Sequence, residues 1–265
     1  MDVTEIDRRQ VGAADTSRAN RGWWDGASDE YQAEHGEFLR DSGFVWCPEG
    51  LDEADVHLLG DVADRDVLEI GCGAGQCGRW LSGHGARVAA FDLSFRQLQH
   101  SRRIDLGSGS RVPVVQADAE ALPFAGESFD LACSAFGALP FVADAAAVLS
   151  EVRRVLRPGG RLVFSVSHPI RWAFPDDPGP GGLTADRSYF DRSPYVEIGD
   201  DGRPSYVEHH RTMADWIGHI VASGLVLRGL VEPEWPQGHE REWGSWSPLR
   251  GRHLPGTAIF TCARP

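Results

Sequence analysis

Hydrophobic positions along the chain alternate between two spacings, and this alternation predicts strands and helices in turn. From residue 66 onward, short apolar runs with the length of buried strands are separated by stretches whose apolar residues recur every three or four positions. The predicted strands cover 66–70, 86–92, 112–118, 128–135 and 161–167, and the predicted helices cover 76–85, 94–104 and 142–156. This order is typical of a parallel sheet that is covered by helices on both faces.

The pattern changes on either side of this region. Residues 17–40 mix aromatic and charged side chains at spacings that allow a helix, and residues 51–62 predict a second helix. Residues 168 to about 205 are rich in Pro, Gly, Asp and aromatic residues, and a run of this length without regular structure is usually functional or disordered. Its aromatic residues favour an ordered segment.

Beyond this insertion the pattern becomes regular again. The sequence predicts a short strand, a helix and two further strands, at 205–211, 212–223, 225–232 and 256–263. The last two strands resemble an antiparallel edge rather than another strand–helix–strand unit. We therefore expect an α/β fold, namely a doubly wound, Rossmann-like sheet of seven strands with an antiparallel last strand.

The composition of the chain indicates which partners and which cellular compartment to expect. The chain has 265 residues and a formal net charge of −13, which disfavours a nucleic-acid surface and an anionic membrane surface. Its five cysteines include no CxxC pair and leave one unpaired, which fits reduced thiols in the cytoplasm. The polar start of the chain, MDVTEIDRRQ, predicts no secretory leader, and no segment is long enough to span a membrane. The oligomeric state stays open.

Glycines follow the first strand of the alternating region, in the stretch VLEIGCGAGQCGRWL. Gly71, Gly73 and Gly75 form a GxGxG that begins where the strand ends, whereas Gly73, Gly75 and Gly78 would form the GxGxxG of dinucleotide-binding proteins. The next strand ends in Asp92, whose carboxylate can accept hydrogen bonds from ribose hydroxyls under either interpretation.

Two features favour the first register. The GxGxG starts directly after the strand, and Gly78 falls inside a predicted helix. The third strand ends at Asp118, where a carboxylate can accept a hydrogen bond from an adenine amino group. With these residues in place, the chain resembles the class I S-adenosylmethionine-dependent methyltransferases, in particular their small-molecule branch. The resemblance covers roughly residues 64–167 through the stretches VLEIGCGAG, AAFDLS, QADAEALPF, SFDLACS and EVRRVLRPGGRLVFS.

The resemblance implies specific contacts with S-adenosylmethionine as the cofactor. It implies that the glycines pack against the methionyl and ribose part, that Asp92 binds the ribose hydroxyls and that Leu93 lies against the adenine. Asp118 and the backbone N–H of Ala119 would bind the adenine edge, and Ser134 would lie near the methionyl amino group. Glu69, at the end of the first strand, is expected either to support the strand end or to contribute to the cofactor site. Cys72 and Cys77 are interpreted as small buried residues.

The resemblance also implies how the chain is divided. Residues 1–63 would form an N-terminal helical lid region, and residues 64–265 the cofactor-binding core, with 168–211 as a substrate-side insertion between strands five and six.

Trp23, Trp24 and Tyr31 would either belong to the lid or be ordinary core aromatics. Residues 168–205, with Trp172 among their aromatic side chains, would form the acceptor wall. The tryptophan-rich segment 232–246 would be a substrate wall or a dimer contact.

His168, at the end of the fifth strand, is the candidate general base, and the alternative is that it fixes the loop around Pro169. His209 and His210 are neighbours in a predicted strand, so at most one of them should face the cleft. Arg211 would bind an acidic group of the substrate or pair with a carboxylate. No metal site is expected, because the His, Asp and Glu residues have no convincing ligand spacing.

The sequence as a whole predicts an enzyme that transfers a methyl group from S-adenosylmethionine to an unidentified small molecule. The main alternative is an NAD(P)-dependent oxidoreductase that uses the second glycine register, and against it the chain has no YxxxK pair. A third interpretation is a non-catalytic S-adenosylmethionine-binding sensor or assembly protein. The sequence does not identify the acceptor, or whether O, N, C or S is methylated.

Overall fold

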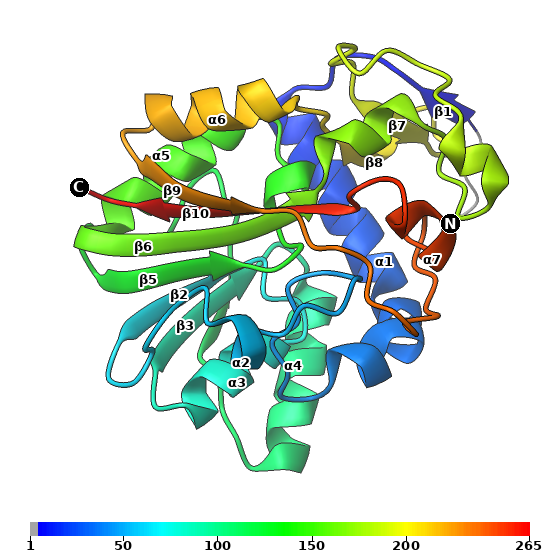
Figure 1. Cartoon of the computed structure of the whole chain (residues 1–265). Helices are drawn as coiled ribbons and strands as arrows, with labels where there is room; N and C mark the ends of the chain where they lie inside the picture. Colours follow the sequence, from blue (N-terminus) through cyan, green and yellow to red (C-terminus); the bar gives the residue numbers. More distant parts are fainter. Residues whose placement is uncertain (1–4) are drawn as a thin grey trace.

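A mostly parallel sheet forms the centre of the computed structural model, which describes residues 5–265 (Figure 1). Its strands are, from one edge to the other, β4 (Val114–Gln116), β3 (Arg87–Asp92), β2 (Asp66–Ile70), β5 (Phe129–Ser134), β6 (Leu156–Ser167), β10 (Thr257–Ala263) and β9 (Val226–Val231). The strands from β4 to β6 pair in parallel, and β10 runs antiparallel to both of its neighbours. The predicted fold class, including the reversed last strand, is confirmed.

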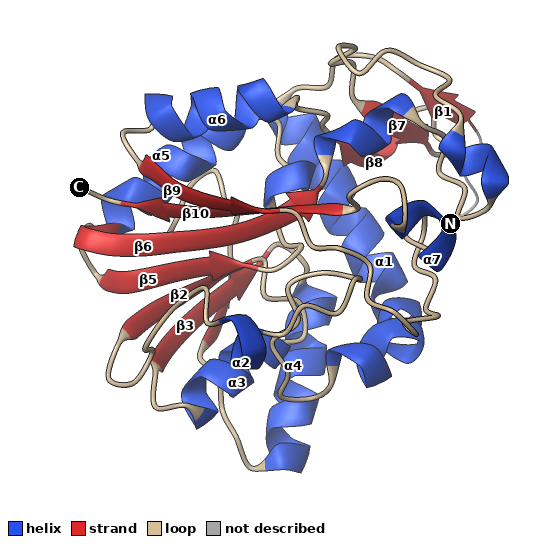
Figure 2. Cartoon of the chain, in the orientation of Figure 1, coloured by secondary structure: helices blue, strands red, loops and turns tan. Residues whose placement is uncertain are grey.

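Helices cover both faces of this sheet (Figure 2). The helices α5 (Ala145–Val155) and α6 (Met213–Ala222) pack on one face, while α3 (Gln76–Gly83), α4 (Phe95–Ser108) and residues 44–62 pack on the other. Successive strand residues point to opposite faces, which explains why the strands are apolar throughout. In β2, Val67 lies in one core cluster and Leu68 in the other.

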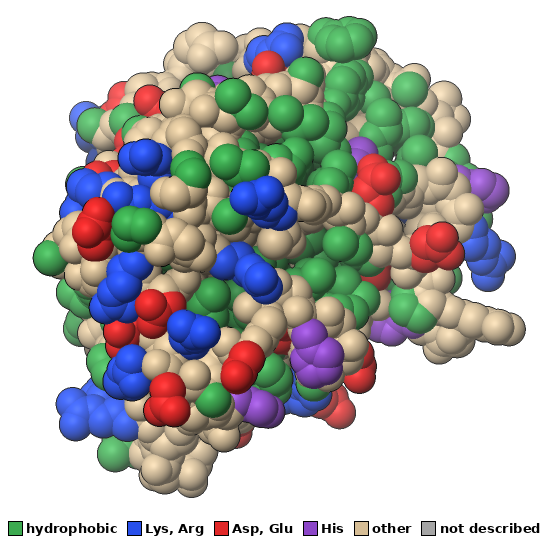
Figure 3. All heavy atoms as spheres, turned by 60° about the vertical axis from the view of Figure 1, so that its left-hand side comes forward, with side chains coloured by type: hydrophobic (Ala, Val, Ile, Leu, Met, Phe, Trp, Pro, Cys, Tyr) green, Lys and Arg blue, Asp and Glu red, His purple; other side chains and the backbone are tan. Residues whose placement is uncertain are grey.

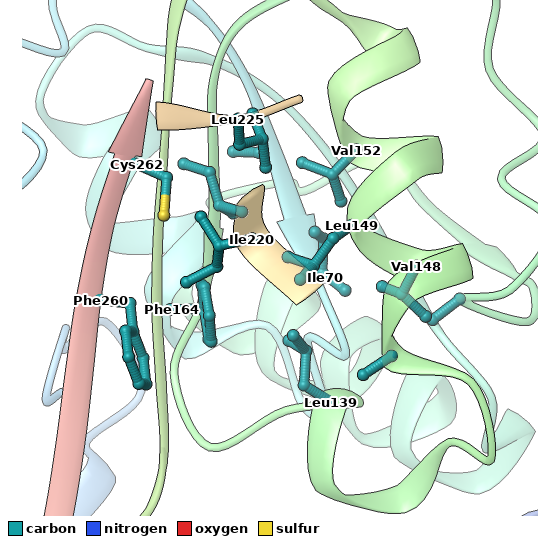
Figure 4. Close-up of a cluster of buried hydrophobic side chains, with 14 of the residues drawn as sticks. Ile70, Leu139, Val148, Leu149, Val152, Phe164, Ile220, Leu225, Phe260 and Cys262 are labelled. Atoms are coloured by element: carbon teal, nitrogen blue, oxygen red, sulfur yellow. The ribbon is translucent and has the colours of Figure 1, made fainter. Parts of the chain in front are cut away.

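The core under α5 and α6 is closely packed (Figure 4). Leu149 of α5 and Ile220 of α6 point toward Phe164 of β6 and Phe260 of β10, and all four side chains are fully buried. The rings of Phe164 and Phe260 stack with their centroids 5.0 Å apart. Side chains cap the N-termini of α4 and α6, because the Ser94 hydroxyl accepts a hydrogen bond from the Gln97 N–H and Thr212 forms a capping box with Asp215.

The prediction of a helix over residues 51–62 is wrong for most of that segment. Only α2 (Glu53–Val56) forms, and it ends at His57, which has a φ of 50°. The reason is the buried carboxylate of Glu53, which accepts hydrogen bonds from the backbone N–H groups of Leu58 and Leu59 and from the Trp46 indole. These bonds bend the segment into a turn, and its apolar side chains pack on the sheet.

A smaller sheet and the long helix α1 (Ala13–Leu39) lie beside the carboxyl ends of the parallel strands (Figure 1). The smaller sheet has the order β1 (Glu5–Asp7), β7 (Tyr195–Ile198) and β8 (Pro204–Glu208). Ala19 of α1 packs in an apolar cluster with Val196, Ile198 and Val207 of this sheet. The remaining short helices are η1 (Leu139–Phe141), η2 (Pro169–Ala173), η3 (Pro180–Leu183) and α7 (Pro248–Gly251).

The predicted lid region and insertion are thus joined in one substructure. β7 and β8 come from the insertion, and β1 comes from the N-terminal region, so the two regions pair with each other. Residues 44–62 instead pack with the large sheet. The first four residues of the chain, on which the expectation of no leader partly rests, lie outside the described residues.

Two further properties concern the helices and the surface of the described residues. No helix between residues 5 and 265 combines the length and the apolar character that crossing a membrane requires. On the face drawn in Figure 3, basic and acidic side chains are interspersed rather than gathered into areas of one sign.

Replacing Leu149 by alanine should lower the free energy of unfolding by about 2–5 kcal/mol, because the side chain is fully buried between α5 and the sheet. Leu106→Ala is the matched control: this leucine, in α4, is 88% exposed and should change stability by less than about 0.5 kcal/mol. Urea unfolding of both variants measures the difference, and equal effects would contradict the described packing.

Candidate active site

The glycine turn after β2 is shaped by three residues in the left-handed region. Gly71, Gly73 and Gly75 have φ values of 65°, 52° and 77°, which non-glycine residues rarely adopt. A Cβ on Gly71 would lie 2.6 Å from the backbone nitrogen of Ala138, so this glycine also permits a close approach of two loops. A Cβ on Gly73 would have no neighbour closer than 3.9 Å, and the space above Gly73 belongs to a cavity.

Asp92, at the end of β3, holds this turn in place. One carboxylate oxygen accepts a hydrogen bond from the Gly73 N–H and the other accepts one from the Ser94 N–H, each at 2.8 Å. Burial raises the pKa of Asp92 to about 6, and the two N–H groups oppose that rise. Both oxygens retain lone pairs, so the carboxylate can accept further hydrogen bonds from a ligand.

Glu69 is a buried carboxylate in the wall of the same cavity, with one oxygen that has no hydrogen-bond partner among the described residues. Burial raises the pKa of Glu69 to about 8, while the guanidinium of Arg79 opposes the rise. Arg79 is itself buried, pairs with Asp105 at 3.1 Å and donates to the carbonyl of Ala74 in the glycine turn. A buried carboxylate in the wall of the cavity favours a ligand group that is cationic or that donates hydrogen bonds.

The cavity lies at the carboxyl ends of β2, β3 and β5, where ligands bind in open parallel sheets. It brings together most of the residues predicted for a cofactor, namely Glu69, Gly71, Gly73, Asp92, Leu93, Asp118 and Ala119. Gly75 lies just beneath it as the N-cap of α3.

Ser134 does not take the predicted position near the cofactor. Its side chain is fully buried, and its hydroxyl donates to the carbonyl of Ile70 at 2.9 Å. The serine therefore ties the end of β5 to the end of β2, and it does not line the cavity. Ala135 and Phe136, the next residues in the chain, line the cavity instead.

Aromatic side chains form the other half of the cavity. Trp24, Tyr31 and Phe38 come from α1, Phe136 and Phe141 follow β5, and Trp243 comes from the tryptophan-rich segment. Trp23, Trp24 and Tyr31 were predicted as lid or core aromatics. Trp24 and Tyr31 line the cavity, whereas Trp23 contacts Tyr206 and does not line it. Of the tryptophans in segment 232–246, Trp243 lines the cavity, so the substrate-wall alternative stays a prediction for this residue. Phe136 and Phe141 follow no recognisable spacing, and the sequence carries no signal for them.

The insertion does not line this cavity, which is a correction to the predicted acceptor wall. Trp172 is buried against His210, with a centroid distance of 5.2 Å, and lies outside the cavity. His209 contacts the Thr16 hydroxyl, and burial lowers its pKa to about 4. Arg211 donates to the backbone carbonyls of Leu139, Val142 and Ala143, so it connects the loop after β5 to the insertion, and it does not line the cavity.

His168 also lies outside the cavity, contrary to its predicted role as a base. One ring nitrogen accepts from the Ile170 N–H, and the other lies 2.8 Å from the Glu232 carboxylate. Burial lowers the pKa of His168, and Glu232 opposes that effect. These contacts match the alternative in which the histidine fixes the start of the insertion. Between residues 5 and 265 no group of three His, Cys, Asp or Glu side chains is arranged to hold a metal ion.

Polar contacts hold α1 over the cavity. The side-chain amide of Asn20 donates to the carbonyls of Phe141 and Val207, and its oxygen accepts from the Val207 N–H. Ser17 donates to the Asp118 carboxylate, and Asp25 accepts from the Ser94 hydroxyl. Sequence periodicity did not reveal this role, because the buried face of α1 is polar rather than apolar.

Comparison with known proteins agrees with the geometry of this site. The family described as "Methyltransferase domain" matches residues 68–164. The chain is 39% identical over 131 residues to the ubiquinone/menaquinone biosynthesis C-methyltransferase of Hahella chejuensis, which is 47% of this chain and 50% of the relative. It is 38% identical over 114 residues to the malonyl-[acyl-carrier protein] O-methyltransferase of Pseudescherichia vulneris, which is 42% of this chain and 43% of the relative.

Among solved structures, an S-adenosylmethionine dependent methyltransferase from Mesorhizobium loti superimposes with a TM-score of 0.65 and 28% identity. The match covers 82% of this chain and 100% of that chain. The chain spans about half the length of the curated relatives it matches. These findings confirm the family resemblance and the fold expected from the sequence.

Asn20→Ala should loosen the attachment of α1, because it removes three hydrogen bonds and leaves buried backbone groups without partners. We expect a loss of about 1–3 kcal/mol in the free energy of unfolding and faster amide exchange in residues 13–39. Arg18→Ala is the control, since Arg18 is exposed and pairs only with Asp15 of the same helix. Unchanged exchange in the Asn20 variant would show that other contacts hold α1.

Proposed function

We propose that this chain, which carries a class I S-adenosylmethionine-dependent methyltransferase domain, transfers a methyl group from S-adenosylmethionine to a small molecule. The observation that carries the proposal is the cavity at the strand ends, where the glycine turn, two carboxylates and Asp118 meet. The matched domain and the relatives named above support the same reaction.

The residues present fit this cofactor. The open space above Gly73 accepts a ligand close to the backbone, and Asp92 has free lone pairs for the ribose hydroxyls. The Glu69 carboxylate lies in the wall of the cavity, where it would be an acceptor for the α-ammonium group. Leu93, Asp118 and the N–H of Ala119 would bind the adenine, and Ser17 already donates to Asp118.

When bound, S-adenosylmethionine would supply an electrophilic methyl carbon, to which an electron pair of the acceptor would bond while the electron pair of the carbon–sulfur bond stayed on sulfur. The protein's own contribution is to align the acceptor with that methyl group and to keep water out. The aromatic half of the cavity and α1 would perform both tasks. A cationic methyl donor also suits the faces of aromatic rings.

The dinucleotide alternative is disfavoured by the comparisons, since the matched domain and the relatives named above are methyltransferases. A Cβ on Gly78, within α3, would come within 2.7 Å of Glu69 Oε2 and 3.0 Å of Val112. The third glycine of a dinucleotide-binding turn also serves close helix-to-sheet packing, so Gly78 does not separate the two alternatives. The sensor alternative is disfavoured by the aromatic half of the cavity, which a protein that binds only the cofactor does not need. We further propose a cytoplasmic location, with a small-molecule acceptor and no nucleic acid partner.

Calorimetry should detect binding of S-adenosylhomocysteine and S-adenosylmethionine, and no binding of NAD(P). Asp92→Asn should weaken S-adenosylhomocysteine by about 1.5–3 kcal/mol, because it removes charge from the acceptor of the ribose hydroxyls and disturbs the contact with Gly73. Asp55→Asn, at an exposed position in α2, is the control and should bind normally. Tight NAD(P) binding without S-adenosylhomocysteine binding would overturn the proposal.

The affinity for S-adenosylhomocysteine should rise with pH between about 5 and 8. The pKa of Asp92 is raised to about 6 and that of Glu69 to about 8 in the free protein, so both are partly protonated below those values. Binding favours the ionised forms, and the affinity should therefore increase by up to about tenfold per pH unit for each group still protonated. Glu69→Gln should remove the rise in S-adenosylhomocysteine affinity between pH 6.5 and 8. A flat or falling profile in the unaltered protein would contradict the assigned roles.

A further inference from the structure

The charges in the cavity are all of one sign and all on one side. Among the described residues that line it, the only charged side chains are Glu69, Asp92 and Asp118, and these belong to the proposed cofactor half. No lysine, arginine or histidine is among those lining residues. A carboxylate or phosphate on the acceptor would therefore face three acids and meet no cation in the lining. Arg241 lies outside the lining, with its guanidinium carbon 5.7 Å from the centroid of the Trp243 ring, and it is held there by the Glu34 carbonyl and the His35 ring.

The acceptor half instead offers flat apolar surfaces. The ring of His35 stacks on Trp243 with a centroid distance of 3.8 Å and an angle of 12°, which fixes the orientation of the indole. The ring of Phe136 lies within 18° of parallel to Trp243, with centroids 6.4 Å apart. A planar molecule that stacks on one of these rings is thus nearly parallel to the other.

Phe136 is held in this orientation by an unusual backbone conformation. Its φ is 57°, which bulky residues rarely adopt and which is found mainly where the surrounding structure imposes it. Its N–H donates to the Ser165 hydroxyl at 2.9 Å, and that hydroxyl donates to the carbonyl of Trp46 at 2.7 Å. Ser165 is fully buried, so this pair of bonds fixes the loop from below.

Tyr31 supplies a hydroxyl to this apolar surface. Its ring packs against Trp24 at 5.4 Å, His35 at 4.8 Å and Trp243 at 6.0 Å. The hydroxyl has no hydrogen-bond partner among the described residues, and burial raises its pKa, so it remains a donor at neutral pH. The only other ionisable lining residue outside the cofactor half is Cys47, whose pKa is also raised by burial.

We infer that the methyl acceptor is a planar aromatic molecule without an acidic group, stacked along Trp243 and Phe136 and hydrogen-bonded by the Tyr31 hydroxyl. The inference rests on the proposed methyl transfer and specifies the acceptor. Among the described residues that line the acceptor half there is no carboxylate or imidazole to act as a base. The reacting atom is therefore one whose electron pair attacks without a base, and any proton that it carries is released to solvent after the methyl group has been transferred.

Three probes of similar size separate the features of this surface: 2-naphthol, which is flat and neutral, decahydro-2-naphthol, which is not flat, and 2-naphthoate, which is flat and charged. Calorimetry with the protein saturated with S-adenosylhomocysteine measures their binding. We expect 2-naphthol to bind at least about tenfold more tightly than either of the others. Equal or tighter binding of 2-naphthoate or decahydro-2-naphthol would overturn the inference.

Variants locate the binding surface. Trp243→Ala and Phe136→Gly should each weaken 2-naphthol at least about tenfold, while S-adenosylhomocysteine affinity stays within about twofold. Glycine at 136 tolerates the positive φ, so that variant removes the ring without adding strain. Trp235→Phe, in the same segment as Trp243 but outside the cavity, should change neither affinity. Unchanged 2-naphthol binding in both test variants, with native melting temperatures, would refute the proposed surface.

The same titrations separate this inference from the proposed function. Absence of S-adenosylhomocysteine binding in the unaltered protein would remove the methyl-transfer proposal and with it the acceptor assignment. Normal S-adenosylhomocysteine binding without discrimination among the probes would remove only the acceptor assignment.

Discussion

The turn between β2 and α3 is the constraint on which the rest of the site depends. Its positive φ angles bring the backbone against the loop after β5, and the Asp92 carboxylate fixes it by accepting the Gly73 N–H. Because the same carboxylate also receives the Ser94 N–H, the starts of α3 and α4 are set relative to each other. The ligand cavity is the space that this arrangement leaves open above the sheet.

Burial gives the site its electrostatic character. Glu69 and Asp92 are acids in surroundings that raise their pKa values, and only part of that cost is offset by Arg79 and by backbone N–H groups. Such a site is stabilised by a ligand that brings donors and positive charge. The opposite half of the cavity is apolar, so the two halves suit two different ligands, one polar and one flat and uncharged.

The sequence could predict the large sheet and the cofactor half because their signals are local. Each strand is recognised from a short apolar run, and each glycine or acid of the cofactor half lies at or just after the end of its own strand. It could not predict the acceptor half, because those side chains come together only through tertiary packing. Trp243 reaches the cavity from far along the chain, and Phe136 does so through a backbone conformation that its residue type disfavours.

The errors have physical causes of the same kind. The pattern at 51–62 was helical, but the Glu53 side chain captured the N–H groups of Leu58 and Leu59. His168, Trp172, His209 and Arg211 were placed at the cleft because they follow the fifth strand. The insertion pairs with β1 and packs against α1. These side chains therefore stabilise the small sheet and its loops instead of lining the cavity.

A crystal structure with bound S-adenosylhomocysteine would test the central claim most directly, because it locates every part of the ligand at once. The account predicts the ribose hydroxyls on Asp92, the amino group at Glu69, the adenine beside Asp118, and the sulfur facing Trp243 and Phe136. A ligand bound elsewhere, or one whose sulfur faces away from the aromatic half, would contradict it.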